Sequence, residues 1–403
     1  MKSQSPELVA ALAGSMRSSV SRRRLLQAAG IGGAAVAVAA CGAGGGSASS
    51  GEAASAEDLS ETEKVVNWSN WPSYLDIDDE TGERPTLAAF QEQTGIAVTY
   101  TEDVNDNNEF FAKVRTQLEQ GQPIDRDIVV LTDWMAAVWI SSGYAQKLNK
   151  AEIPNEVNLV PKYVDVSFDP GREYSLPWQS GFGGLGYNKA ALQQALGVDS
   201  ITTIDQLFDP ALKGKITVLS EMRDTMGCLM AWQGNDPSNF TKEQFEQAIA
   251  ELAKQVDSGQ IRQVTGNDYI GALEKGDVVA VIGWSGDLFA LGDEFGFGLP
   301  ESGGMLWTDN MLIPPLASHK TNAEKLMNYY YEPEVAAKVA AYVNYICPVQ
   351  GAQEAMVAID PALAESPWIF PTTEILDQSY VFMELTVAED AEYQRMFQTA
   401  IGN

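Results

Sequence analysis

The chain has 403 residues, which is enough for two domains at the usual length of about 150 residues each. It carries 55 acidic residues against 26 lysines and arginines, a formal net charge of −29. Nucleic-acid binding needs basic surface and is not expected, whereas a field of this sign attracts cations. With one histidine and three cysteines, we expect no catalytic residue, no metal and no cofactor.

Residues 1–40 have the pattern of an export signal peptide. Three arginines at 22–24 resemble a twin-arginine motif, although such residues also occur in general export signals. The apolar stretch 25–40 is too short and too rich in alanine and glycine for a membrane span. Residues 38–42 resemble a bacterial lipobox, which makes Cys41 the expected lipidation site. An ordinary signal peptide with a chance cysteine is the alternative.

The run of glycine, serine and alanine at 41–57 is typical of a flexible tether. A lipidated cysteine followed by such a tether predicts a monomer held at the outer face of the cytoplasmic membrane, in the cell envelope or periplasmic space.

From residue 58 onward, the patterns of strands and helices alternate. Strands are expected at 64–68, 96–100, 127–131, 215–219, 278–284 and 307–313. Helices are expected at 87–94, 109–119, 241–256, 323–330 and 333–343, and 374–401 is expected to be helical in part. Strands that alternate with helices predict βαβ units and a mostly parallel sheet of the α/β class.

The glycine-rich run 181–186 has the spacing of a dinucleotide-binding loop. It follows no clear strand, and no helix is expected to begin at its last glycine. Both are needed for such a loop, so a dinucleotide site is not expected.

Several segments, in this order and spacing, resemble the bacterial spermidine/putrescine-binding proteins, the solute receptors of polyamine ABC transporters. They are KVVNWSNWPSY at 64–74, TGI at 94–96, DIVV at 127–130, YSLPW at 174–178, GYN at 186–188, GW at 283–284, WTD at 307–309 and YICP at 345–348. The resemblance spans about residues 62–380.

The resemblance implies a two-lobed periplasmic-binding-protein-like fold. Each lobe would be a mixed, mostly parallel sheet flanked by helices, with the ligand cleft between the lobes. The first lobe would comprise 58–178 plus 309–353. The second would comprise 179–308 plus 354–403.

Three acids are the strongest candidates for ligand binding. Trp307 and Asp309 lie two apart on an expected strand, so both face the same way and could hold an ammonium group. Glu221 and Asp224 lie three apart at a strand-to-helix turn and share one helical face. Acids that complement a helix dipole, or an acid/base couple of a hydrolase, are the alternatives for this second pair.

The resemblance adds further ligand-binding positions: Trp68, Ser69, Trp71, Thr132, Trp134, Trp284 and Tyr345. The chain departs from the family where Asn70 replaces a common acid and where Trp71 and Trp134 replace tyrosines. Phe382 falls where the family has a glutamine. These departures leave the preferred polyamine open, as does the pairing of Cys228 with Cys347.

The function expected from this resemblance is an extracytoplasmic polyamine receptor that is not an enzyme. It would deliver spermidine or putrescine to the permease subunits of an ABC importer by closing its lobes. The alternative is the same fold with another organic cation or a sugar as ligand.

Overall fold

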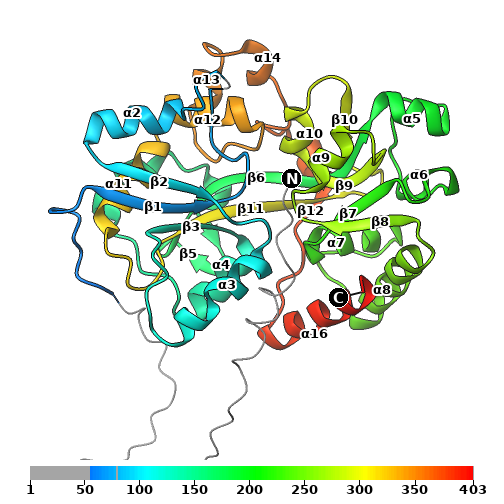
Figure 1. Ribbon diagram of the computed structural model, residues 1–403, viewed down its shortest axis with the longest axis horizontal. Helices are drawn as coiled ribbons and strands as arrows, with labels where there is room; N and C mark the ends of the chain where they lie inside the picture. Colours follow the sequence, from blue (N-terminus) through cyan, green and yellow to red (C-terminus); the bar gives the residue numbers. More distant parts are fainter. Residues whose placement is uncertain (1–54, 79, 403) are drawn as a thin grey trace, which may run out of the picture. The chain divides into compact units, whose positions relative to one another are not determined.

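A ten-stranded mixed sheet forms the centre of the computed structural model (Figure 1). The structure describes residues 55–78 and 80–402. The expected signal peptide at 1–40, the expected lipidation site Cys41 and most of the expected tether lie outside these residues.

The strands of this sheet are β1 (Val65–Asn70), β2 (Ala97–Glu102), β3 (Ile128–Thr132), β6 (Ser175–Asn188), β7 (Ile216–Leu219), β8 (Ile261–Thr265), β9 (Ala280–Trp284), β10 (Phe295–Gly298), β11 (Gly304–Leu312) and β12 (Ser379–Tyr380). Their order is β2-β1-β3-β11-β6-β9-β7-β8, with β10 beside β6 and β12 beside β11. A separate two-stranded sheet joins β4 (Asp165–Val166) to β5 (Asp169–Pro170).

The sheet has two parallel parts, which we call the first half (β2, β1, β3) and the second half (β9, β7, β8). Within each half the neighbouring strands are parallel. The long strands β6 and β11 lie between the halves; they pair in antiparallel fashion with each other, β11 also with β3, and β6 also with β9. Figure 1 shows both running through the molecule, so the predicted α/β class is confirmed. The predicted lobe boundaries stay a proposal, because one sheet is continuous through both halves.

Helices flank both halves of the sheet. Around the first half lie α2 (Pro85–Thr94), α3 (Asn107–Glu119), α4 (Asp133–Ser141), α11 (Lys320–Tyr330) and α12 (Pro333–Val343). Around the second lie α5 (Lys189–Leu196), α6 (Ile204–Leu207), α7 (Met222–Trp232), α8 (Lys242–Asp257), α9 (Tyr269–Glu274), α10 (Ser285–Ala290) and α16 (Val387–Ala400).

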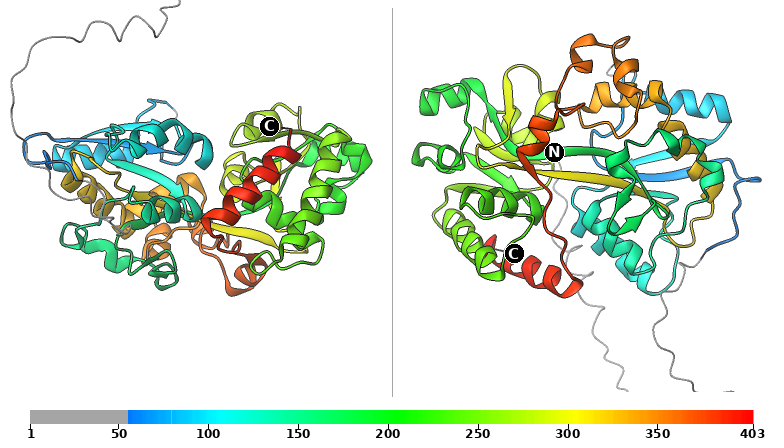
Figure 2. Two further views of the ribbon diagram at one scale, coloured as in Figure 1. Left: turned by 90° about the horizontal axis from the view of Figure 1, so that it is seen from below. Right: turned by 180° about the vertical axis from the view of Figure 1, so that it is seen from behind.

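Short helices occupy much of the connecting chain. They are η1 (Lys150–Glu152), η2 (Pro154–Asn158), η3 (Pro161–Tyr163), η4 (Pro210–Leu212), α13 (Ala352–Met356), α14 (Pro361–Ala364) and α15 (Thr373–Asp377). The predicted helical region 374–401 is thus divided into α15, β12 and α16. Figure 2 shows the chain between β12 and α16 passing between the two halves before α16 covers the second half.

Local sequence explains where the main helices begin and end. Helix α8 begins after Thr241, whose hydroxyl accepts the backbone N–H of Gln244 while the Gln244 side chain bonds back, a capping box. Helix α2 ends at Gly95, which adopts a left-handed φ of 70° that a side chain would disfavour. Both helices were predicted within two residues of their observed bounds.

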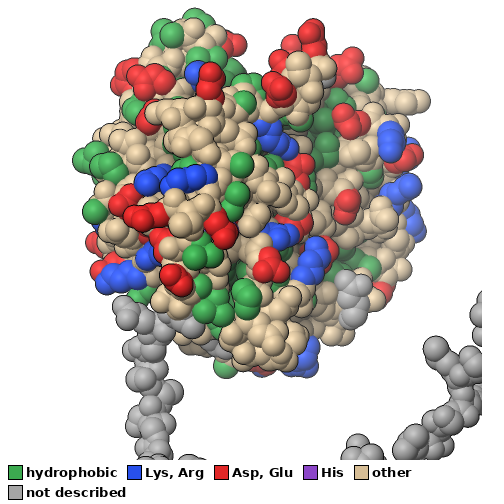
Figure 3. Space-filling view, turned by 60° about the vertical axis from the view of Figure 1, so that its left-hand side comes forward, with side chains coloured by type: hydrophobic (Ala, Val, Ile, Leu, Met, Phe, Trp, Pro, Cys, Tyr) green, Lys and Arg blue, Asp and Glu red, His purple; other side chains and the backbone are tan. Residues whose placement is uncertain are grey.

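The surface is strongly acidic, as Figure 3 shows for one face, where aspartates and glutamates are spread among fewer lysines and arginines. Among the described residues, no helix is long and apolar enough to cross a bilayer. Cys228 and Cys347 are both buried free thiols in this structure.

Candidate ligand-binding site

A cavity of about 560 Å³ lies between the two halves, beside the middle of β11. This size is within the range of small-molecule sites, roughly 300–1,000 Å³. Its walls come from β11 and from the chain at or just after the carboxyl ends of β1, β3, β7 and β9. The carboxyl ends of strands are where open α/β sheets place their ligands.

Nine of the predicted ligand-binding residues line this cavity. They are Trp71, Thr132, Trp134, Glu221, Asp224, Trp284, Trp307, Asp309 and Tyr345. The structure therefore brings together residues from both halves that are far apart in the sequence. Their contact with a ligand stays a prediction.

Trp68 and Ser69 do not line the cavity, so their predicted place there needs correction. Both belong to β1, which extends two residues beyond the expected strand end at Trp68. The Trp68 ring is fully buried and packs edge-on against Tyr100 and Trp178, with ring centroids 5.0 and 5.1 Å away. The Ser69 hydroxyl accepts a hydrogen bond from Arg126 Nε at 2.6 Å. Side chains of a strand point to the two faces of the sheet, and along β1 only the residues beyond the strand end, from Trp71 on, reach the cavity.

Asp309 lies on β11 opposite Thr132 of β3. Its carboxylate accepts hydrogen bonds from the Thr132 hydroxyl at 2.7 Å and from the Tyr74 hydroxyl at 2.9 Å. Burial, with a smaller effect from the nearby carboxyls of Asp133 and Asp224, raises the pKa of Asp309 to about 7. Its two hydroxyl donors are neutral, so a cation beside this carboxylate would be strongly stabilised.

Asp287 is a further buried acid of the cavity, and we did not predict it. It lies in the first turn of α10 and accepts hydrogen bonds from Tyr345 and Tyr269, both at 2.8 Å, and from Asn267 at 3.1 Å. Burial raises its pKa to about 6. The signal in the sequence was its spacing: Asp287 follows Trp284 by three residues at a strand-to-helix turn.

Glu221 and Asp224 enter the cavity from the start of α7. Glu221 accepts hydrogen bonds from the backbone and side-chain N–H groups of Asn107 at 3.1 and 2.9 Å. Asp224 accepts one from the Trp284 indole at 3.2 Å. Burial raises the pKa of Glu221 to about 8 and that of Asp224 to about 7. Across residues 55–78 and 80–402, no three or more His, Cys, Asp or Glu side chains are grouped so that they could hold a metal ion.

Arg223 stands between these two acids in the sequence and also lines the cavity. Its Nη2 pairs with Asp390 of α16 at 2.9 Å. Its guanidinium lies 4.2 Å from the centroid of the Trp134 ring and 5.7 Å from that of Phe382. A cation of the protein itself thus covers Trp134, a ring that we predicted to contact the ligand.

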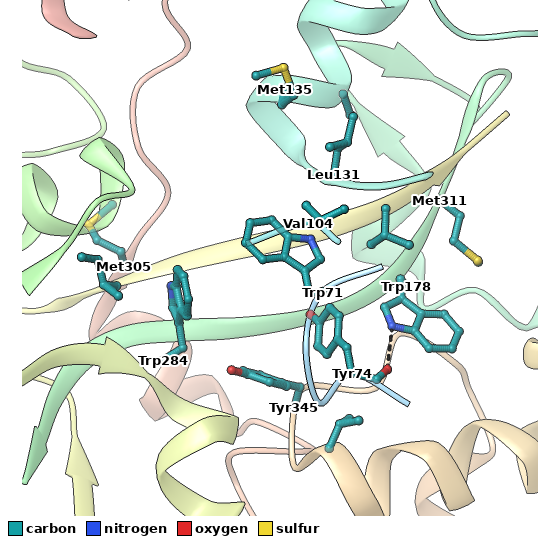
Figure 4. Close-up of a cluster of buried hydrophobic side chains, with 14 of the residues drawn as sticks. Trp71, Tyr74, Val104, Leu131, Met135, Trp178, Trp284, Met305, Met311 and Tyr345 are labelled. Carbon is teal, nitrogen blue, oxygen red and sulfur yellow. Dashed lines mark hydrogen bonds between the residues drawn. The ribbon is translucent and has the colours of Figure 1, made fainter. Parts of the chain in front are cut away.

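Aromatic rings form a continuous wall. Trp71 lies 6.1 Å from Trp284, Trp284 6.4 Å from Trp307, and Trp307 5.3 Å from Tyr345, all as ring-centroid separations. Tyr74 packs edge-on against Tyr345 at 5.3 Å. Figure 4 shows the rings of Trp71, Tyr74 and Tyr345 near one another, with Trp284 to their left in this view. The faces of aromatic rings can contact a cation and the aliphatic carbons attached to it.

The glycine-rich run 181–186 lies inside β6 and makes room for this wall. A Cβ atom on Gly181 would come within 2.5 Å of the Trp307 ring and 2.7 Å of the Tyr345 ring. One on Gly183 would come within 2.5 Å of the Asp224 carboxylate. Gly181 and Gly183 therefore leave the space that Trp307, Tyr345 and Asp224 occupy.

Residues 86–366 match the model of the bacterial extracellular solute-binding protein family. The chain belongs to this family. It is 25% identical over 340 residues to the putrescine-binding periplasmic protein PotF of Escherichia coli, a match that covers 80% of this chain and 87% of PotF. This solute-binding protein is therefore an extracytoplasmic receptor that works with an ABC importer and is not an enzyme.

Solved structures show the same fold. The substrate-binding protein PotD of a spermidine/putrescine ABC transporter from Streptococcus pneumoniae has a TM-score of 0.66 at 23% identity, covering 84% of this chain and 98% of that one. The binding protein AgtB of A. tumefaciens, solved with agropinic acid, has a TM-score of 0.65 at 17% identity and covers 84% of this chain and 99% of AgtB. Proteins that share this fold are thus named for different ligands, so the fold alone does not identify the ligand of this chain.

Proposed function

We propose that this solute-binding protein is the receptor of a polyamine importer. The observation that supports this most strongly is the set of four buried carboxyl groups in an aromatic cavity: Glu221, Asp224, Asp287 and Asp309. Burying carboxylates without a counter-charge is costly, and their raised pKa values express that cost. A ligand with several ammonium groups offsets this cost of burial, because each ammonium forms charge-assisted hydrogen bonds with a carboxylate.

The aromatic wall fits the carbon chain of such a ligand. A polyamine alternates ammonium groups with short methylene segments. The rings of Trp71, Trp284 and Trp307 would cover the methylenes, and each cation–π contact contributes roughly 0.5–2 kcal/mol depending on desolvation. Trp134 would contribute less than predicted, because Arg223 already covers one of its faces.

A sugar or another organic cation is the alternative ligand. Neutral sugars stack on tryptophan but leave buried carboxylates without a partner, which makes them the weaker candidate. Choline-like cations suit an aromatic box and require fewer acids. An acidic ligand, such as the agropinic acid bound to AgtB, would be repelled by the same carboxylates.

Titration calorimetry on the purified full-length protein tests this proposal. The ligands are putrescine, spermidine, spermine, choline, maltose and agropinic acid. Binding of polyamines alone is the expected result. Binding of choline, maltose or agropinic acid in their place would retain the fold and refute the proposed role of the carboxylates.

Closure of two lobes around the ligand is part of the proposal. The lobes are those expected from the resemblance, 58–178 plus 309–353 and 179–308 plus 354–403. Closure would exclude water, strengthen each ion pair through the lower dielectric constant, and present the shape that the permease recognises. Solution X-ray scattering should show a smaller radius of gyration with putrescine, and an unchanged radius would refute closure.

Lipid anchoring through Cys41 completes the proposal. Metabolic labelling with a radioactive fatty acid should label the wild-type protein and leave Cys41→Ala unlabelled. Equal labelling of both proteins would exclude Cys41 as the acceptor.

A further inference from the structure

The chain that begins α3, in the first half, lies directly against the turn that follows β7 in the second half. The Ser220 hydroxyl donates a hydrogen bond to Asp106 Oδ2 at 2.8 Å. Glu221 Oε1 accepts hydrogen bonds from the backbone N–H of Asn107 at 3.1 Å and from its side-chain amide at 2.9 Å. Three hydrogen bonds therefore join the two halves at the start of α3.

Glu221 completes the hydrogen bonding of this helix end. The first backbone N–H groups of a helix have no partner within the helix. The Asp106 side chain accepts the N–H groups of Asn108 and Glu109 at 2.8 and 3.1 Å. The N–H of Asn107, a fully buried residue, is accepted by Glu221 of the second half. The helix dipole also favours a carboxylate here, so the first half offers Glu221 a well-matched partner.

Gly266 allows the two halves to approach one another beside these hydrogen bonds. It directly follows β8. A Cβ atom on Gly266 would lie 2.5 Å from the backbone oxygen of Asn105 and 3.0 Å from its side-chain nitrogen. Its φ is not positive, so the missing side chain serves the close approach and not the backbone conformation. We call the six residues of this contact the latch: Asn105, Asp106 and Asn107 in the first half, and Ser220, Glu221 and Gly266 in the second.

A chain of hydrogen bonds connects the latch to Asp309 in the cavity. The Thr132 hydroxyl donates to Asp309 at 2.7 Å, and its single proton is thereby used. The same oxygen can then only accept, and it does so from Asn107 Nδ2 at 2.8 Å. The Thr132 N–H donates to Asn107 Oδ1 at 3.1 Å, which fixes the orientation of the amide. The two hydrogens of Nδ2 therefore go to Thr132 and to Glu221.

We propose that Asn107 is a positioning residue that couples a ligand at Asp309 to closure of the two halves through the latch. This inference rests on the proposed function and concerns how the same site holds its ligand. An ammonium beside Asp309 stabilises the ionised carboxylate, which accepts the hydrogen bond of the Thr132 hydroxyl. Asn107 then remains the donor to Glu221 and keeps the latch closed. Because no latch contact described above involves a ligand atom, the latch should slow ligand release and leave ligand entry unchanged.

Gly266→Ala tests the latch without changing a residue that lines the cavity. The added methyl group meets the backbone of Asn105, so the halves cannot close fully. Putrescine should then dissociate at least about tenfold faster, while its association rate constant stays within about twofold of the wild-type value. Release of radiolabelled putrescine after dilution measures dissociation, and calorimetry measures the affinity from which the association rate constant follows. Dissociation at the wild-type rate would overturn the proposal.

Gly271→Ala is the matched control. Gly271 lies in α9 of the second half, and a Cβ atom there would meet nothing within 4 Å. Its φ is not positive either, so alanine suits the backbone at both positions. Gly271→Ala should leave both rate constants unchanged. If it accelerates release as much as Gly266→Ala does, the effect does not come from the latch, and the proposal is wrong.

Asn107→Ala tests the coupling. It removes the side-chain hydrogen bonds to Thr132 and Glu221, so putrescine release should again be faster. In the Gly266→Ala background, where the latch is already open, the same substitution should accelerate release by no more than about twofold. If the two effects multiply instead, Asn107 acts independently of the latch. If Asn107→Ala does not fold, Gly266→Ala and its control still decide whether the latch exists.

Amide hydrogen exchange tests the latch without any ligand. Because Glu221 accepts the Asn107 N–H, protection of this amide should fall in Gly266→Ala and persist in Gly271→Ala. Equal protection in wild type and Gly266→Ala would overturn the latch. If the wild-type protein binds no polyamine, the proposed function fails. If polyamines bind and Gly266→Ala releases putrescine at the wild-type rate, only the latch fails.

Discussion

Asp309 and Asp287 differ from Glu221 and Asp224 in what surrounds their carboxyl groups. The first pair is held by hydroxyl and amide donors and has no cation beside it. The second pair lies at the start of α7 with Arg223 between its members in the sequence, and the charge of Arg223 favours the ionised form of Asp224. Acids of one cavity, all buried, can therefore contribute differently to binding, because the contribution depends on how much of the negative charge the protein has already neutralised.

The largest effect on this comparison should come from Asp309→Asn. The amide keeps the size of the side chain and removes the charge that an ammonium would meet, so putrescine affinity should fall by about a hundredfold. Calorimetry measures the putrescine affinity, and circular dichroism checks that the variant keeps its fold. If the putrescine affinity of Asp309→Asn stays within about threefold of the wild-type value, Asp309 does not contact the ligand.

A change of pH should weaken binding through the same pair. The pKa of Asp309 is about 7 and that of Asp287 about 6 without ligand, whereas aliphatic ammonium groups titrate near pH 10. Lowering the pH from about 8 to about 6 protonates the acids and not the ligand, so affinity should fall by about tenfold or more. Binding near neutral pH should release protons, measurable as a dependence of the heat on the buffer. Equal heats of binding in buffers of different ionisation enthalpy would contradict the predicted release of protons.

A smaller effect is expected for Asp224→Asn. Arg223 already stabilises the charge of Asp224. Removing that charge by Asp224→Asn should therefore weaken putrescine binding by only about three- to fivefold. The sharpest test compares the loss of putrescine affinity in Asp224→Asn with the loss in Asp309→Asn. If Asp224→Asn costs as much as Asp309→Asn, the two pairs are equivalent and the comparison fails.

The stability of the ligand-free protein should also depend on pH, through the same first pair of acids. The folded pKa of Asp309 and Asp287 lies above the ordinary value of 3.8, so the folded state keeps protons that the unfolded state has lost. Their stabilising contribution is complete below about pH 4 and is lost as pH rises through about 6 to 7. Each pKa unit corresponds to about 1.4 kcal/mol, so the free energy of unfolding should fall by about 4 kcal/mol between pH 5 and 8. Urea unfolding of Asp309→Asn/Asp287→Asn should show a shallower slope.

Much of the fold could be predicted, because strand and helix periodicity is a local property. The same periodicity placed Trp307 and Asp309 on one face of a strand, and both line the cavity. It placed Trp68 in a strand but did not show that this side chain packs into the core, three residues before the first side chain that reaches the cavity. The contribution of Arg223 was hidden for another reason: its partner Asp390 lies 167 residues away, and local patterns carry no information on such pairs.

The aromatic wall has a practical consequence for anyone who works with this receptor. Four of its nine tryptophans, Trp71, Trp134, Trp284 and Trp307, line the cavity. Their fluorescence depends on nearby charges and on contact with water, and a ligand alters both. The unlabelled protein therefore contains its own optical reporter, and single substitutions of these tryptophans would map which part of the cavity each ligand occupies.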